Sequence, residues 1–181
     1  MVEVIEYRPE WPSEFEEAAR VIAAAMGPLA LRVDHIGSTA VPGLCAKDVI
    51  DVQITVAALD EPVVRAMTAA GFVHRLAVVR DHVPPGGDSS PGLWRKFFFV
   101  EPDGYRRLNV HVRRAGLPNQ RFPLLFRDFL IAAPHYAAAN GTLKRRLAEA
   151  LTDPVTYADV KDPAVDLIYF AALEWANRTS A

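Results

Sequence analysis

The amino-acid sequence predicts an α/β protein of the α+β kind, in which a mixed β-sheet is flanked by helices and followed by a C-terminal helical segment. Residues 48–56 alternate between apolar and polar side chains, which is the period of a half-buried strand. Residues 12–26 carry apolar side chains every three or four positions, which is the period of an amphipathic helix. Both patterns occur up to about residue 116, and only the helical one continues beyond it. This order is typical of a mixed sheet covered by helices.

The length and composition are those of one globular domain. The chain has 181 residues, of which 51% are hydrophobic and 23% charged, and this is enough to bury one sizeable core. No internal repeat or long linker divides the sequence. We therefore expect a single domain over 1–181, with a sheet core and its flanking helices in 1–116 and a helical part in 117–181 packed on it.

Charge and cysteine content limit the partners and the compartment. The net charge of −2 gives no support for an extended nucleic-acid surface or for membrane binding. The one cysteine, Cys45, excludes an internal disulfide and is expected to be a small buried residue in a reducing cytosol. The first residues are acidic and interrupted by Pro9 and Pro12, unlike a signal peptide. We expect a cytoplasmic protein whose partner is a small molecule, with a protein partner left open.

The individual elements follow from these periods and from the residues that interrupt them. Pro12 suits a first helical turn, and Gly27-Pro28 ends that helix. In chain order we predict a helix over 12–26, strands over 31–35 and 48–56, a helix from Asp60 to Gly71, a strand over 72–79, a loop over 81–93, a hairpin of 94–101 and 105–113, and helices over 124–132, 142–151 and 163–177, separated by Pro134, Asn140-Gly141 and Pro154.

Two of the predicted strands have one apolar and one polar face. The polar face of 48–56 carries Asp51 and Gln53, and that of 105–113 carries Asn109 and His111. If the two strands are neighbours, Asp51 and His111 converge beside the turn at Gly37-Ser38. The alternative is that Asp51 only pairs with a nearby Lys or Arg.

This convergence predicts a cation site beside a phosphate cradle, and hence a binding site for an anionic, phosphate-bearing small molecule. Asp51 and His111 are the predicted catalytic residues and the predicted ligands of one divalent metal, Mg²⁺, Mn²⁺ or Zn²⁺. A glycine followed by hydroxyl side chains lets a phosphate approach backbone N–H groups. The predicted phosphate- and ligand-binding residues are Gly37, Ser38, Thr39, Lys47, Arg95, Arg107 and Asn109.

Other polar residues remain open or are expected to be exposed. Asp81 and His82 begin a Gly- and Pro-rich loop, and we expect both to be solvent-exposed. The basic residues of the C-terminal part lie either on a solvated helical face or against the sheet, where they would line a cleft. These residues are Arg127, Lys144, Arg145, Arg146 and Lys161.

Several longer segments form a recognisable pattern. They are His35-Ile-Gly-Ser-Thr-Ala-Val-Pro-Gly-Leu44, Ala46-Lys47-x-x-Ile50-Asp51, Asn109-Val-His-Val112, Phe126-Arg-Asp-Phe-Leu130, Leu143-Lys-Arg-Arg-Leu147 and Tyr157 to Lys161. Together they resemble the GrpB family, relatives of the nucleotidyltransferase superfamily, over nearly the whole chain. The resemblance implies the nucleotidyltransferase fold with added C-terminal helices. It also implies that Gly37-Ser38 corresponds to that superfamily's Gly-Ser signature for nucleotide phosphates.

The resemblance leaves two functions open. Active members of the superfamily carry Asp-x-Asp on the strand after this signature and a third carboxylate later, whereas this chain has Asp51, Gln53 and then His111. One carboxylate and one imidazole are a poor ligand set for two Mg²⁺ ions. The first hypothesis is a nucleotide- or phosphate-binding protein, with one metal and nucleotidyl transfer if it is catalytic. The second is a non-catalytic interaction or folding-assistance module, like the GrpB-like domain fused to dephospho-CoA kinases.

Overall fold

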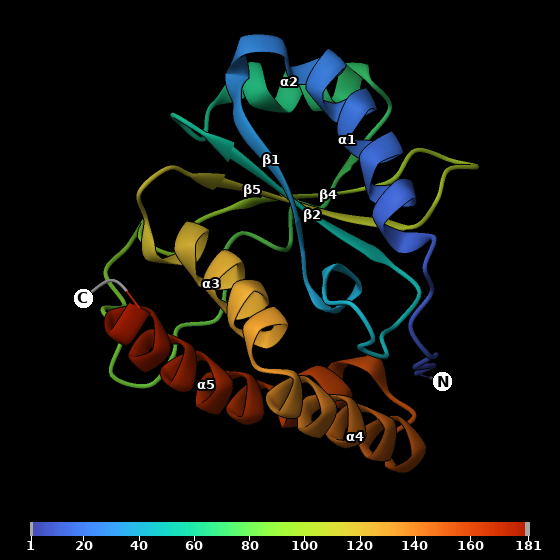
Figure 1. Cartoon of the computed structure of the whole chain (residues 1–181). Helices are drawn as coiled ribbons and strands as arrows, with labels where there is room; N and C mark the ends of the chain where they lie inside the picture. Colours follow the sequence, from blue (N-terminus) through green and yellow to red (C-terminus); the bar gives the residue numbers. More distant parts are fainter. Residues whose placement is uncertain (1, 180–181) are drawn as a thin grey trace.

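The structure, a computed structural model, describes residues 2–179 and has a five-stranded sheet with helices on both faces (Figure 1). The elements are α1 (Trp11–Met26), β1 (Ala30–Ile36), β2 (Ile50–Val56), α2 (Glu61–Ala69), β3 (Val73–His74), β4 (Phe97–Val100), β5 (Leu108–Arg114), α3 (Pro118–Ala132), α4 (Pro134–Ala150) and α5 (Pro154–Thr179), with short 3₁₀ turns at Gly27–Leu29 and Ser38–Ala40.

The strands lie in the order β1-β2-β5-β4-β3. β2 and β5 are parallel, and every other neighbouring pair is antiparallel. In the parallel pair Asp51 lies opposite Asn109, and Gln53 lies opposite His111. The predicted mixed sheet and the hairpin of β4 and β5 are therefore confirmed, and the two polar strand faces lie side by side at the centre of the sheet.

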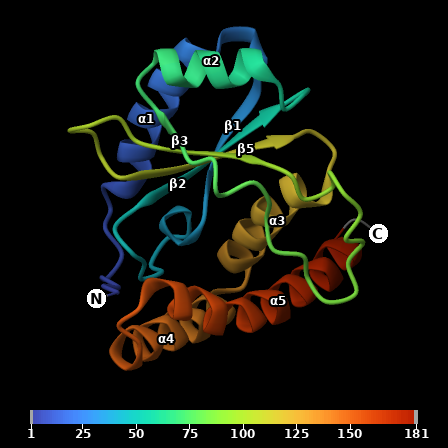
Figure 2. The same ribbon diagram turned by 180° about the vertical axis from the view of Figure 1, so that it is seen from behind.

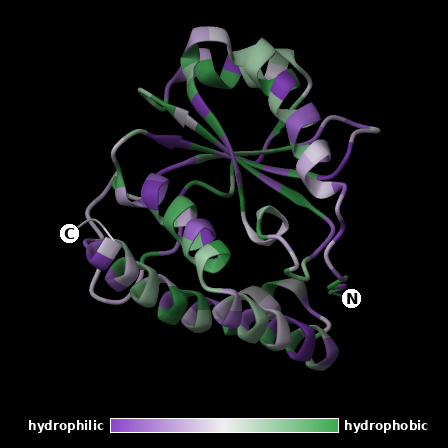
Figure 3. Cartoon of the chain, viewed as in Figure 1, coloured by the Kyte–Doolittle hydropathy of each residue, from purple (hydrophilic) through white to green (hydrophobic). Residues whose placement is uncertain are grey.

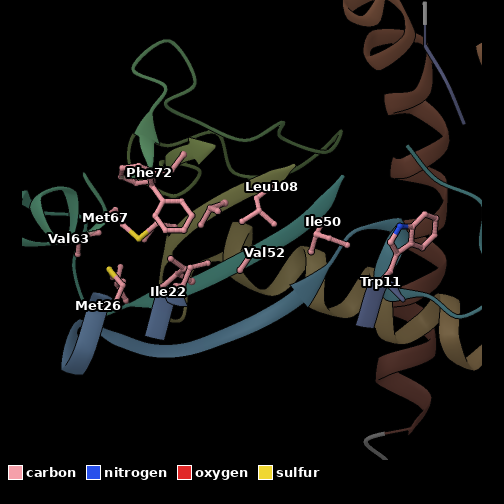
Figure 4. Packing of buried hydrophobic residues seen from close by; sticks show 14 of the residues in the cluster. Trp11, Ile22, Met26, Ile50, Val52, Val63, Met67, Phe72 and Leu108 are labelled. Atoms are coloured by element: carbon pink, nitrogen blue, oxygen red, sulfur yellow. The ribbon is translucent and has the colours of Figure 1, made fainter. Parts of the chain in front are cut away.

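The apolar face of β2 and β5 packs against α1 and α2 (Figure 4). Ile50 and Val52 of β2, Ile22 of α1 and Met67 of α2 are all 0% exposed and belong to one cluster. Burial of each such side chain contributes roughly 1.5–3 kcal/mol. A strand shifted by one residue would lose this burial, so the core fixes Asp51 on the opposite face.

The opposite face of the sheet is turned toward the C-terminal helices, of which α4 and α5 lie farthest from it (Figure 2). A second apolar cluster joins Phe129 of α3, Ala137 of α4 and Ile168 of α5 to Val41 and Leu44 in the loop between β1 and β2. These helices are thus attached mainly to one another and to that loop. The polar faces of β2 and β5 remain free to line a cleft.

The strand predicted for 72–79 is wrong beyond its first residues. Only Val73 and His74 pair with β4. Leu76 is 75% exposed and Val79 is 56% exposed, so this apolar run does not cover a sheet face. A turn, closed by a hydrogen bond of 3.0 Å from Val78 N to the carbonyl oxygen of Arg75, interrupts the strand, and the chain pairs again at the isolated bridge of Arg80 with Arg95.

The C-terminal helices are longer than predicted, and Asn140-Gly141 does not separate two of them but lies inside α4. Gly141 is buried, and a Cβ in its place would lie 3.3 Å from Cys45 Sγ and Leu44 Cδ1. The glycine therefore permits close packing of α4 on the β1–β2 loop. Pro163, predicted to begin the last helix, lies within α5. Cys45 is buried, as expected.

No helix within residues 2–179 has the length and apolar character needed to cross a membrane. Hydrophobic and hydrophilic residues are interleaved along α4 and α5 (Figure 3). Such interleaving suits helices that pack on one side and face solvent on the other.

Candidate functional site

A cleft between the polar face of β2 and β5 and the three C-terminal helices contains two adjoining cavities, of about 270 and 220 Å³. Both are lined by Ser38, Asp51, Lys144 and Lys161. The smaller one, here called the lysine cavity, is also lined by Thr39, Ala46, Lys47, Val49, Asn109 and Tyr157. The larger one, here called the aromatic cavity, is also lined by Ile36, Gly37, Asp81, His82, Trp94, His111, Arg113, Asn119, Phe122, Pro123, Phe126, Asn140, Asp162 and Val165.

The turn after β1 places Gly37 and Ser38 against Asp51. Gly37 has φ 72° and ψ −170°, a backbone conformation that is essentially restricted to glycine. A Cβ at this position would lie 2.9 Å from Cβ and Cγ of Asp51 and would collide with its Oδ2. The absence of a side chain at Gly37 therefore makes room for the carboxylate of Asp51.

Lys144 reaches this turn from α4. Its side chain is buried, and its Nζ donates hydrogen bonds to Ser38 Oγ at 2.9 Å and to the carbonyl oxygen of Cys45. Burial lowers the pKa of Lys144 from 10.5 to about 8. An ammonium group held away from water with only neutral acceptors is unfavourable in the free protein. A bound anion would supply the missing negative charge.

Lysine is scarce in this chain, and every lysine lies at the cleft or directly behind it. Among 20 basic residues the lysines are Lys47, Lys96, Lys144 and Lys161. Within residues 2–179, Lys96 is the one lysine whose Nζ has a carboxylate oxygen within 4.0 Å. Asp51 is the one carboxylate among the described residues that line the lysine cavity. Three ammonium groups therefore face one carboxylate there.

Lys47 and Tyr157 close the outer side of the lysine cavity. Lys47 Nζ lies 4.2 Å from the centroid of the Tyr157 ring, a cation–π contact. Burial and the charge of Lys161 lower the pKa of Lys47. Burial likewise raises the pKa of the Tyr157 hydroxyl, so that group stays neutral. The tyrosine ring holds Lys47 in place without cancelling its charge.

A second group of cations, Lys96 and Arg113, lies at the aromatic cavity and is paired. Lys96 Nζ lies 2.7 Å from Asp81 Oδ1, and Arg113 donates two hydrogen bonds of 2.8 Å to the same carboxylate. Burial opposes ionisation of Asp81, but Arg113 and Lys96 outweigh it and hold its pKa well below the ordinary value. The prediction that Asp81 is solvent-exposed is wrong, because these two buried cations require its charge.

The same two cations fix the protonation of His111. Its Nδ1 lies 3.2 Å from Lys96 Nζ and 3.2 Å from Arg113 Nη2. Arginine can only donate, so Nδ1 must accept and the ring hydrogen is on Nε2. That Nε2 lies 3.8 Å from Asp51 Oδ1. Burial, together with Arg113, lowers the pKa of His111 to about 4, so the ring is neutral at physiological pH.

Asp51 is ionised beside this neutral imidazole. Its Oδ1 accepts a hydrogen bond of 2.9 Å from Asn109 Nδ2. Burial would raise the pKa of Asp51, but the interactions with His111 and Asn109 outweigh it and lower the pKa. Within residues 2–179 no three His, Cys, Asp or Glu side chains are grouped to hold a metal ion. One carboxylate and an imidazole whose Nε2 carries hydrogen do not fit the predicted divalent metal.

Gln53 occupies the position where the resemblance leads one to expect a second carboxylate. Its Oε1 accepts a hydrogen bond of 2.8 Å from Arg113, and its Nε2 donates one of 3.0 Å to the carbonyl oxygen of Gln120. Both ends of the amide are thus engaged, and the residue is 0% exposed. Gln53 holds the paired cations in place and offers no oxygen to the cleft.

The aromatic cavity has an apolar wall opposite the sheet. Phe122 and Phe126 come from one side of α3, and Phe122 stacks on Tyr169 with ring centroids 3.9 Å apart. At the far end, His82 Nε2 lies 3.0 Å from both carboxylate oxygens of Asp166, which attaches the loop over 81–93 to α5. A planar apolar group would find stacking surface here.

The structure brings most of the predicted site residues together. Arg95 and Arg107 are the exceptions, because both are exposed and line neither cavity. Arg95 lies over the ring of Phe97 at 5.8 Å, and Arg107 lines a third depression, which shares Lys47 and Val49 with the lysine cavity. The predicted residues at the two cavities are Gly37, Ser38, Thr39, Lys47, Asp51, Asn109 and His111.

The most important residue that the sequence left open is Lys144. Lys144 and Lys161 line the cleft, whereas Arg145 and Arg146 are exposed. The scarcity of lysine in an arginine-rich chain is a signal that could have distinguished the two lysines from the two arginines. Lys96 and its role at His111 were not predicted at all.

Comparisons with known proteins agree with the fold. The family model described as GrpB protein matches residues 1–170. A crystal structure of the conserved protein GrpB from Enterococcus faecalis superimposes with a TM-score of 0.74 at 28% identity, covering 96% of this chain and 99% of that one.

Relatives of two kinds match at the level of sequence. The dephospho-CoA kinase of Mycolicibacterium paratuberculosis is 38% identical over 94% of this chain but only 46% of its own length. The chain thus spans about half the length of such relatives. The UPF0157 protein BH1888 of Halalkalibacterium halodurans is 32% identical over 92% of this chain and 80% of its own length. The chain belongs to the GrpB family.

Proposed function

We propose that this protein binds an anionic, phosphate-bearing small molecule, such as a nucleotide, in the cleft between the sheet and the C-terminal helices. The observation that carries the proposal is the excess of positive charge in the lysine cavity, where Lys47, Lys144 and Lys161 face Asp51 alone among the described lining residues. A lysine in a cleft whose pKa is lowered by burial, as that of Lys144 is, marks a candidate functional site.

The two cavities together match the two parts of a nucleotide. The lysine cavity would take the phosphates, with Ser38 and Thr39 as hydroxyl partners. The aromatic cavity would take the base between Phe122 and the sheet, since small-molecule sites combine apolar walls with a few polar groups. The relationship to the nucleotidyltransferase superfamily, and with it nucleotidyl transfer, stays a prediction.

Adenine nucleotides are the first probes to test, because relatives of this chain are named dephospho-CoA kinases. ADP, dephospho-CoA and pyrophosphate should raise the melting temperature by mass action. Lys161→Gln should weaken ADP binding about tenfold, whereas Arg146→Gln, which removes an equal charge from an exposed position on α4, should change it less than about twofold. Absence of binding by every probe at millimolar concentration, or equal losses in both variants, would contradict the proposal.

A second candidate is a non-catalytic module that assists the folding of a dephospho-CoA kinase. It is favoured by the match of this chain to about half of those proteins. α5 also exposes Val160 and Leu167, seven residues apart and hence on one helical face. This candidate predicts that the chain raises the refolding yield of a separately produced kinase region, and that Leu167→Glu abolishes the effect. An unchanged yield would count against it.

A further inference from the structure

We infer that the cleft recognises its phosphate ligand as the metal-free anion, with Lys47, Lys144 and Lys161 in the place that divalent metals hold in other phosphate sites. This inference rests on the proposed function. It goes beyond that function because it names the ionic form of the ligand and excludes the metal that the sequence predicted for Asp51 and His111.

The first support is the orientation of His111. A metal would have to bind the lone pair of Nε2, which requires the ring hydrogen to be on Nδ1. Nδ1, however, faces two donors, Lys96 Nζ and Arg113 Nη2, each at 3.2 Å. Moving the hydrogen to Nδ1 would set it against both cations. His111 is therefore a hydrogen-bond donor toward Asp51 and not a metal ligand.

The second support is that, among the described residues, no second carboxylate lines the lysine cavity beside Asp51. Mg²⁺ prefers near-octahedral coordination by oxygen, with carboxylates as its usual protein ligands. Gln53 is engaged at both ends of its amide. Asp81 is held by Lys96 and Arg113. Asp51 would be the only anionic ligand among the described residues lining the lysine cavity.

The third support is the excess of positive charge in the lysine cavity. Lys144 has no carboxylate oxygen within 4.0 Å among the described residues, and neither has Lys47 or Lys161. Lysine binds phosphate well as a point charge. Three ammonium groups can balance the charge of a diphosphate that carries no metal. A ligand that arrives with Mg²⁺ already has part of its charge neutralised, and the bound metal would be repelled by the same lysines.

Calorimetric titration of ADP and of pyrophosphate, once in EDTA and once with excess Mg²⁺, tests the inference. ADP should bind in EDTA, and its affinity should fall about threefold or more when Mg²⁺ is in excess. Binding that requires Mg²⁺ would overturn the inference and leave the proposed function intact. Binding of neither probe in either condition would overturn the proposed function itself.

Asp51→Asn provides a second measurement that separates the two schemes. If lysines alone bind the phosphate, removal of this carboxylate should tighten ADP binding in EDTA by about twofold or more, because it removes a repulsive charge. If a metal is needed, the same variant should lose binding in Mg²⁺. Circular dichroism and the melting temperature show that the variant is folded. Loss of ADP binding by folded Asp51→Asn would overturn the inference.

Discussion

Two groups of cations lie at the same cleft and differ in how their charge is balanced. Lys96 and Arg113 share the carboxylate of Asp81 at hydrogen-bond distance. Lys144 of the lysine cavity has only the Ser38 hydroxyl and a backbone carbonyl as acceptors. We infer from this difference that the first group stabilises the fold and sets the protonation of His111. The charge of the second group is available to a ligand. The predictions below test that division.

The largest expected effect is on stability, at the paired group. Asp81→Ala would leave Arg113 and Lys96 buried without a counter-ion, and should lower the free energy of unfolding by about 3–5 kcal/mol. Urea denaturation at neutral pH measures this. Asp103→Ala, at an exposed position, is the matched control and should cost less than about 1 kcal/mol. A loss of similar size in both variants would break the division between the two groups.

Gly37→Ala should disturb the lysine cavity without changing any charge. The new methyl group would collide with Asp51 in addition to straining the backbone. Gly43 also has positive φ, 77°, but open space around it, so Gly43→Ala measures the backbone strain alone, about 1–2 kcal/mol. Gly37→Ala should cost about 3 kcal/mol or more. Equal melting temperatures of the two variants would show that the close approach to Asp51 is unimportant.

Acid should destabilise the paired group. The pKa of His111 is about 4 in the folded protein, against 6.5 for an ordinary histidine. The unfolded chain therefore binds more protons between these values, and stability falls as the pH is lowered through this window. The contribution is on the order of 1–3 kcal/mol. His35, whose pKa burial also lowers to about 4, adds to it. His111→Gln should flatten the dependence of melting temperature on pH, and an unchanged slope would contradict this account.

Alkali should weaken ligand binding at the lysine cavity. The charged groups that act on Lys144 are Lys161, Asp51 and Arg145. Because its pKa is about 8, Lys144 loses its positive charge as the pH rises through that value. The affinity for ADP should then fall by up to about tenfold per pH unit. The free energy of unfolding rises with pH over the same range, because the unfolded chain still binds the proton that the folded chain has lost. Lys144→Met should abolish the pH dependence of ADP binding in this range, and its persistence would assign the proton to another group.

The arrangement of the sheet could be predicted because strand parity and core burial reinforce each other. The alternation in 48–56 alone places Asp51 opposite the core, and the structure agrees. Residues 72–79 show the limit of this approach, since a turn closed by the hydrogen bond from Val78 N to the carbonyl oxygen of Arg75 ends the strand after Val73 and His74 in spite of the apolar pattern. Gly141 shows another limit, because its close packing on Leu44 and Cys45 involves residues far away in the sequence.

The predicted site lacked residues that come from distant parts of the chain, for the same reason. The turn at Gly37-Ser38 and the strand at Asp51 lie within one short segment, so their convergence could be foreseen. Lys144 is 106 residues from Ser38, and no local pattern relates the two. The protonation of His111 depends on Lys96 and Arg113, two basic residues that no local pattern relates to the site.

The most direct test of the division between the two cation groups is a calorimetric titration of ADP into Lys144→Met beside Lys96→Met, with the free energy of unfolding of both. Lys144→Met should bind ADP about tenfold or more weakly and unfold within about 1 kcal/mol of the wild type. Lys96→Met should instead lose stability, because it breaks a buried pair. Wild-type affinity in Lys144→Met, with a loss of stability equal to that of Lys96→Met, would contradict the account.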